Sequence, residues 1–165
     1  DGLALLENCA HEIRTLAYVL HPPGLDETGL AGAIRLYAAG FGERTGIATR
    51  VELPGDLDRL EETAELVLFR VVQECLGNIH RHAHSPTASV RLRQEAAVVE
   101  LEIRDEGGGI PAQILDGKPG PHVGLGVGIR GMRERLRQLG GRLTIDSSPH
   151  GTTVRAIVPR QSGQA

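Results

Sequence analysis

The chain has 165 residues, a net charge of −3 and 40% apolar residues, with two Tyr, two Phe and no Trp. This length is enough for one domain with a real core, which must be built mainly from Leu, Val, Ile and Ala. The slight acidity and the absence of a Lys/Arg stripe argue against a nucleic-acid-binding surface. The two cysteines, Cys9 and Cys75, have no paired spacing, which indicates reduced thiols rather than a disulfide framework or a zinc site.

The first half of the chain is predicted to be mainly helical. Apolar residues recur at helical spacing over residues 2 to 20 and again over about 26 to 45. The two prolines of HPPGLDE separate these helices, because proline cannot continue a helix. A short strand in IATRVELPG is followed by a long helix over about 59 to 83, for which Asp58 is the expected N-cap.

The second half is predicted to be mainly strands. TASVRLRQE and AVVELEIRD alternate apolar and polar residues, as in a hairpin with one buried face. Half of residues 107 to 124 are Gly or Pro, which predicts a long functional or disordered loop. A helix over about 125 to 139 precedes the strands GRLTIDSS and GTTVRAIVP. Paired strands without crossover helices predict an α+β fold, a two-layer sandwich with a mixed, mostly antiparallel sheet.

The sequence GLGVGIRG raises two interpretations. Gly126, Gly128 and Gly131 satisfy the G-x-G-x-x-G dinucleotide pattern, and Asp146 follows at about the expected distance. That pattern requires an apolar strand running into the first glycine, whereas DGKPGPHV precedes it here, so an NAD site is disfavoured. Gly124, Gly126 and Gly128 still place unobstructed amides at a helix start, which favours an anion site. A flexible surface loop is the alternative.

Two further groups of residues carry candidate chemistry. Glu74, Asn78 and His82 are spaced i, i+4, i+8 along one polar face of the long helix. The Asn78 side-chain oxygen suits Mg²⁺, although these could also be ordinary solvated helix residues. In RDEGGGI, Asp105 ends a strand and is followed by Gly107 and Gly109, so its carboxylate could accept a hydrogen bond from the amine of a base.

The order of QECLGNIHRHA, DEGGG, GLGVG and GTTVRAIVP resembles the ATP-binding domain shared by gyrase, heat-shock chaperones, histidine kinases and mismatch-repair ATPases. The resemblance covers residues 25 to 159 and implies the Bergerat fold of this GHKL superfamily, with about five strands under three helices. It implies that the loop over 107 to 124 is a mobile ATP lid.

The same resemblance implies roles for single residues. Glu74 is the catalytic residue that assists an accepting histidine, and Asn78 binds Mg²⁺. Asp105 reads the adenine amine, and Thr152 supports the adenine through water. The other residues expected at the ATP site are His82, Gly107, Gly109, Gly124, Gly126 and Gly128.

Within the superfamily, EIRTLAYVLHPPGLDETGL, FGERTGI and GIRGMRERLRQLGG resemble histidine kinases of the nitrate-sensor type. This resemblance implies three parts: residues 1–24 as the remnant of the second dimerisation helix with its linker, 25–160 as the catalytic domain, and 161–165 as a disordered tail. Since the chain begins with Asp1, we expect a piece of a longer protein.

The expected activity is that of a two-component sensor histidine kinase, which transfers the γ-phosphate of Mg-ATP to a histidine. The E-L-H-D phosphoacceptor motif of the nitrate-sensor group does not occur. AHEIRTL is a substitute candidate, but only about fifteen residues separate His11 from Asp26, too few for a second dimerisation helix. We therefore expect the acceptor histidine on a dimerisation domain outside this chain, and no autophosphorylation by the chain alone.

The expected partners are this dimerisation domain and the receiver domain of a response regulator, with no nucleic acid. The parent is expected to be a homodimer and this piece a monomer. Its location is expected to be cytoplasmic, with membrane anchoring of the parent left open. Two alternatives remain. One is a serine kinase of the anti-sigma-factor type, which the linker LHPPGLDE disfavours, and the other is a non-catalytic nucleotide-binding regulatory module.

Overall fold

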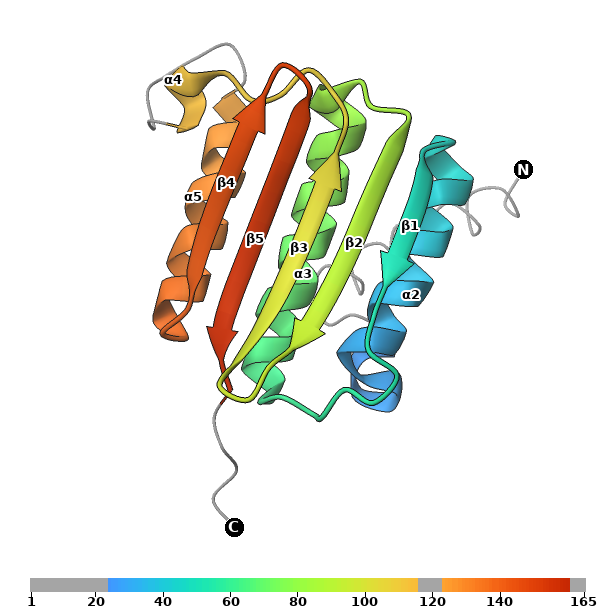
Figure 1. Ribbon diagram of the computed structural model, residues 1–165, viewed down its shortest axis with the longest axis vertical. Helices are drawn as coiled ribbons and strands as arrows, with labels where there is room; N and C mark the ends of the chain where they lie inside the picture. Colours follow the sequence, from blue (N-terminus) through green and yellow to red (C-terminus); the bar gives the residue numbers. More distant parts are fainter. Residues whose placement is uncertain (1–23, 116–122, 161–165) are drawn as a thin grey trace, which may run out of the picture.

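A single five-stranded sheet forms one layer of the protein. The computed structural model describes residues 24–115 and 123–160, so the predicted helix over 2 to 20, His11, residues 116–122 of the predicted lid and the predicted tail lie outside the described residues. The strands lie in the order β1-β2-β3-β5-β4 (Figure 1). β1 pairs in parallel with β2, and the other neighbours are antiparallel. Their bounds are β1 Ala48–Glu52, β2 Thr87–Gln94, β3 Val98–Asp105, β4 Arg142–Ser148 and β5 Gly151–Pro159.

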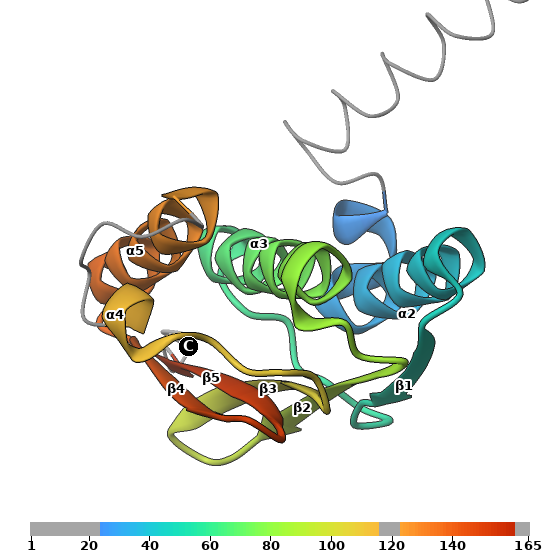
Figure 2. The same cartoon turned by 90° about the horizontal axis from the view of Figure 1, so that it is seen from above.

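The second layer consists of helices on one face of the sheet. Figure 2 shows α2, α3 and α5 side by side above the strands, with the other face of the sheet open. The bounds are α2 Leu25–Thr45, α3 Glu62–Asn78, the π-helical turn η1 Ile79–Ala83, α4 Ala112–Leu115 and α5 Val123–Gln138. The predicted α+β sandwich, with five strands under three long helices, is therefore confirmed. Among the described residues, no helix is long and apolar enough to cross a membrane.

The core lies between the two layers. β2, β3 and β5 bury alternate residues, as the period of a strand with one buried face requires. α3 lies over the middle of the sheet and buries more than one side, including Leu68, Phe69, Val72 and Leu76. The strand residues that face it include Val90, Leu92, Leu101, Ile103, Ala156 and Val158. This central position fixes the far end of α3 next to the end of β3.

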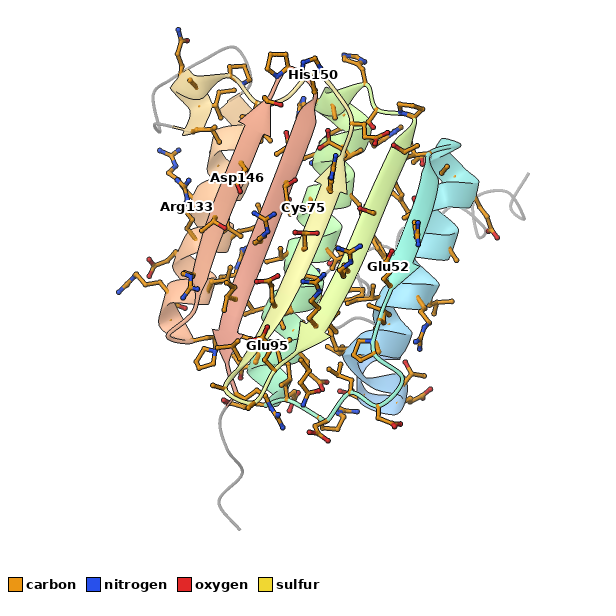
Figure 3. All side chains as sticks on the ribbon, viewed as in Figure 1. Glu52, Cys75, Glu95, Arg133, Asp146 and His150 are labelled. Carbon is orange, nitrogen blue, oxygen red and sulfur yellow. The ribbon has the colours of Figure 1, made fainter. Side chains whose placement is uncertain are left out.

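A row of alternating charges crosses the open face of the sheet. Glu52 Oε2 lies 2.6 Å from Arg91 Nε, and Arg91 Nη1 lies 3.6 Å from Glu102 Oε1. Arg155 then contacts both Glu102, at 2.8 Å, and Asp146, at 2.7 Å. Figure 3 shows Glu52 and Asp146 on the two edge strands. Charges of both signs make this face compatible with water, so the protein buries only the other face.

The structure corrects three details of the predicted elements. The long helix begins at Glu62, and Asp58 is not its cap: the N-cap is Glu61, without a side-chain cap hydrogen bond. Asp58 instead bonds Gln94 and Arg160, which ties its loop to β2 and the end of β5. The predicted loop after residue 107 contains the one-turn helix α4, and α5 begins at Val123 rather than near 125.

Candidate nucleotide-binding site

A cleft opens at the end of the protein where α3 and β3 end and where α5 and β5 begin, the upper end in Figure 1. It encloses about 500 Å³, its open mouth included. Five of the predicted site residues line it: Asn78, His82, Asp105, Gly109 and Thr152. The remaining lining residues are Cys75, Ile79, Ala83, Ile103, Ile110, Leu125, Ile129, Met132, Ile145 and Val154. The cleft is therefore mostly apolar, with a few polar groups, as small-molecule sites usually are.

Asp105 is a carboxylate in a sheltered position in this cleft. The residue is 6% exposed. Its Oδ1 accepts hydrogen bonds from the backbone N–H of Gly107, at 2.8 Å, and of Thr152, at 3.3 Å. Burial raises the pKa of Asp105 above its ordinary value of 3.8, although these two hydrogen bonds act in the opposite direction. Because Oδ1 is already engaged, Oδ2 is available to accept a hydrogen bond from a ligand.

The glycines after Asp105 allow three chain segments to meet beside it. A Cβ on Gly107 would collide with the backbone oxygen of Ala83, where η1 ends. A Cβ on Gly109, which has φ 78°, would collide with the backbone oxygen of Ser148 at the end of β4. Gly107 and Gly109 thus make room for backbone, which fits the predicted absence of obstructing side chains beside Asp105. Gly107 itself does not line the cleft.

Thr152 forms a pair of neighbouring hydroxyl groups with Ser147. The sequence predicted Thr152 as a site residue but not Ser147. Thr152 Oγ1 lies 3.0 Å from Ser147 Oγ, which also accepts a hydrogen bond of 2.7 Å from the backbone N–H of Ile110. Ser147 therefore joins β4, β5 and the segment after the glycines. Its only sequence signal was a polar residue in an alternating strand, which does not distinguish it from a solvated serine.

The end of α3 presents Asn78 and His82 to the cleft through an unusual turn. Asn78 is the last α-helical residue, and His82 lies in the π-helical turn η1. Such wide turns are rare and occur often at functional sites. Asn78 Oδ1 accepts a hydrogen bond of 3.2 Å from Arg81 Nη2. His84 directly follows η1, and its φ of 53° is uncommon for a residue other than glycine.

Glu74 lies beside α5, one turn before Asn78. It is not among the residues lining the cleft. Its carboxylate lies so close to Gly128 that a Cβ there would collide with Glu74 Oε1. Gly124 and Gly126 lie near the start of α5, where the first N–H groups have no partner within a helix, whereas Gly128 lies in the second turn. The structure thus brings Glu74 and Gly128 together, two residues that the sequence had assigned to different motifs.

The apolar wall of the cleft contains Cys75, which Figure 3 labels on α3. Its Sγ lies 3.9 Å from Met132 Sδ of α5. Burial raises the pKa of the Cys75 thiol far above its ordinary value, so the residue is a small apolar group rather than a nucleophile. Cys75 is free, whereas Cys9, the other predicted reduced thiol, lies outside the described residues. An apolar space with one buried acceptor suits a heterocyclic base.

Comparison with known protein families identifies the domain. Residues 63–162 match the model of the histidine kinase-, DNA gyrase B- and HSP90-like ATPases. The chain belongs to this ATPase family. The predicted superfamily is therefore confirmed, and ATP is the nucleotide that the family implies.

Two curated relatives of the ATPase chain are named as sensor kinases. One is the sensor histidine kinase MctS of Rhizobium johnstonii, 36% identical over 163 residues, which cover 99% of this chain and 34% of the relative. The other is the signal transduction histidine-protein kinase/phosphatase UhpB of Salmonella typhimurium, 38% identical over 150 residues, which cover 90% and 28%. The chain thus spans about a third of the length of these relatives.

A solved structure supports the fold of the ATPase domain. The histidine kinase domain of a blue-light activated histidine kinase from Erythrobacter litoralis superposes with a TM-score of 0.65. The match covers 79% of this chain and 61% of the other, with 22% sequence identity. At this identity the likeness concerns the fold.

Proposed function

We propose that the chain is the ATP-binding catalytic domain of a two-component sensor histidine kinase. It binds Mg-ATP and directs the γ-phosphate to a histidine on a dimerisation domain. Membership of the ATPase family and the names of the relatives support this function. The nitrate-sensor group is the proposed subgroup, with residues 25–160 as the catalytic domain and residues 1–24 as the remnant of the dimerisation helix with its linker.

The observation that carries the proposal is the buried carboxylate of Asp105. Two backbone N–H groups fix its Oδ1, and apolar side chains surround the adjoining space. A fixed acceptor in such a space can read the exocyclic amine of adenine, because an amine without a partner there would lose its hydrogen bonds to water. We assign Asp105 to the adenine amine, with Thr152 beside it and Gly107 and Gly109 as the glycines that let the backbone at Ala83 and Ser148 approach this segment.

The polar end of the cleft fits a triphosphate with its metal ion. Among the described residues, no group of three or more His, Cys, Asp or Glu could hold a metal. Mg²⁺ suits this arrangement because it commonly keeps waters and takes ligands from substrate phosphates and one or two protein oxygens. Asn78 Oδ1 is the proposed protein ligand, with His82 beside it. When bound, the ion would neutralise charge on the phosphates.

The remaining roles fall to the chain's own groups. The unpaired N–H groups at the start of α5 favour an anion, which supports Gly124 and Gly126 as phosphate-binding residues. Gly128, in the second turn, is proposed to bind the phosphates because it belongs to the same glycine motif. Glu74 is the proposed base that takes a proton from the accepting histidine. The segment over 107 to 124 is the proposed lid that excludes water.

The proposed partners follow from the same function. They are the kinase's own dimerisation domain and the receiver domain of a response regulator, in a homodimeric parent whose catalytic domain works in the cytoplasm. The anti-sigma-type serine kinase and the non-catalytic nucleotide module are the rival functions.

Calorimetric titration with ATP, with and without Mg²⁺, and with NADH tests the nucleotide. We expect ATP to bind more tightly with Mg²⁺ and NADH not to bind. Binding of NADH in preference to ATP would contradict the proposal. A phosphoserine product on an added protein substrate would favour the serine kinase instead.

A further inference from the structure

Arg59 lies in the loop between β1 and α3 and contacts the beginnings of two helices. Its Nε lies 3.1 Å from Oε1 of Glu65, in the first turn of α3. Its Nη1 donates a hydrogen bond of 3.2 Å to the backbone oxygen of Asp26, in the first turn of α2. The planar guanidinium can make both contacts at once because its donors point in fixed, different directions.

Glu65 is the buried side of this bridge. Its side chain is 1% exposed, and its Oε1 also accepts a hydrogen bond of 3.1 Å from the backbone N–H of Leu60. Within the described part of the chain, its Oε2 has no hydrogen-bond partner. A buried carboxylate that loses its counter-charge is strongly unfavourable. Arg59 is therefore required to stay near Glu65 for the start of α3 to remain as it is.

The turn on the other side of Arg59 is set apart from the rest of α2. Gly29, with φ 68° and ψ −179°, interrupts the helix between residues 25–28 and the remainder. Leu25 buries its side chain in the core at 1% exposure, and the Thr28 hydroxyl donates back to the Gly24 oxygen at 2.7 Å. Residues 25–28 are thus a compact turn that joins the rest of α2 at Gly29, because glycine adopts such angles without strain.

We propose that Arg59 is a latch that ties this turn, through which the preceding chain enters the domain, to the helix that leads to the cleft. While Nη1 holds Asp26, the turn at 25–28 and the first turn of α3 are fixed to each other. Movement of the turn breaks this bond and leaves Arg59 on Glu65 alone. α3 carries Asn78 at its other end. The latch thus joins the turn at 25–28 to the beginning of the helix that carries Asn78, a role separate from ATP binding.

Arg59→Lys separates the two contacts of the latch. Lysine keeps a charge for Glu65 but lacks the fork that reaches Asp26 at the same time. By hydrogen exchange of the ligand-free chain, we expect the hydrogen-bonded amides of this turn, such as Thr28 N–H, which donates to the Gly24 oxygen, to exchange about tenfold faster in R59K. This is the effect of losing one partly exposed charged hydrogen bond. The melting temperature should stay near that of the wild type. Arg93→Lys, on the open face of β2, is the matched control and should change neither reading.

Two further variants separate a latch from a simple stabilising contact. Arg59→Gln removes the charge and should lower the melting temperature, because Glu65 stays buried without a counter-ion. Glu65→Gln added to R59Q should restore the melting temperature but not the protection of residues 25–29. Exchange in R59K equal to the wild type, or full protection in the double variant, would overturn the latch. Hydrogen exchange and melting temperature are measured without nucleotide. They therefore test the latch even if the proposed kinase function proves wrong.

Discussion

At the scale of residues, Asp105 gives the sharpest prediction about binding. In Asp105→Asn, Oδ1 can still accept from Gly107 and Thr152, while an NH₂ group replaces Oδ2 and cannot accept from adenine. A hydrogen bond to a charged group contributes about 1.5–3 kcal/mol, so ATP should bind roughly 10- to 150-fold more weakly by calorimetry. Asp146→Asn, on the open face of β4, is the control. Unchanged affinity in a folded D105N protein would remove the adenine assignment.

The same variant predicts a pH dependence of stability. Because burial raises the pKa of Asp105 in the folded protein, its contribution to stability is fully present below the ordinary pKa of 3.8 and is lost as pH rises through the raised value. The amide introduced by Asp105→Asn does not titrate, so D105N should gain stability relative to the wild type as pH rises toward neutrality. Urea unfolding of both proteins at several pH values measures this. A gain that grows toward acid would have the wrong sign.

Asn78 should matter mainly through the metal. Asn78→Ala removes the proposed Mg²⁺ ligand, so ATP affinity should fall when Mg²⁺ is present and change little in EDTA. Titrations of the wild type and the variant under the two conditions give the comparison. Equal losses with and without the ion would mean that Asn78 supports the structure of the cleft, for instance through its bond with Arg81.

At the scale of elements, two glycines of α5 form a matched pair. A Cβ on Gly131 would meet only the Arg135 guanidinium at ordinary contact distance, so Gly131→Ala should stabilise the helix by up to about 1 kcal/mol. In Gly128→Ala the new Cβ would displace the Glu74 carboxylate. We expect G128A to stay folded and bind ATP, because Ala keeps the N–H group. Phosphotransfer to an added dimerisation segment with its histidine should fall, by at most the roughly 10²- to 10⁴-fold that a positioned base contributes. Full transfer in G128A would exclude Glu74 as the base.

Periodicity predicted most elements of this fold, and tertiary contacts explain what it missed. The alternation in β2 and β3 gave both strands, because the sheet has one buried and one wet face. Asp58 had the right residue type for a cap, but its bonds to Gln94 and Arg160 join positions far apart in the sequence. The close contact between Glu74 and Gly128 could not be predicted from the sequence either, because it depends on how α5 packs against α3. Motif order located Asp105, Asn78, His82 and Thr152, whereas no pattern distinguished Ser147 or the apolar wall.

At the scale of the whole molecule, one face of the sheet is exposed to solvent and the other is covered by helices. The charge row from Glu52 to Asp146 consists of partly exposed pairs, which water and salt screen, so that each contributes little to stability. Stability must therefore come from the helix-covered face, where α3 fills the core. The end of that same helix carries Asn78, and so the most buried element also presents the candidate metal ligand. This arrangement gives the site a rigid support on one side and the segment after Gly109 on the other.

The last prediction concerns phosphoryl transfer by the whole protein. Phosphoryl transfer depends mainly on positioning and charge stabilisation. Without a correctly placed acceptor, the γ-phosphoryl group of bound ATP is therefore not transferred. Since the chain spans about a third of its relatives, the proposed acceptor histidine lies in the remainder. With radiolabelled ATP alone, the chain should gain no acid-labile, base-stable label. Addition of a separate dimerisation segment with its histidine should place such a label on that segment, and D105N should abolish it. A label on the isolated chain that disappears in His11→Gln would instead make AHEIRTL the acceptor.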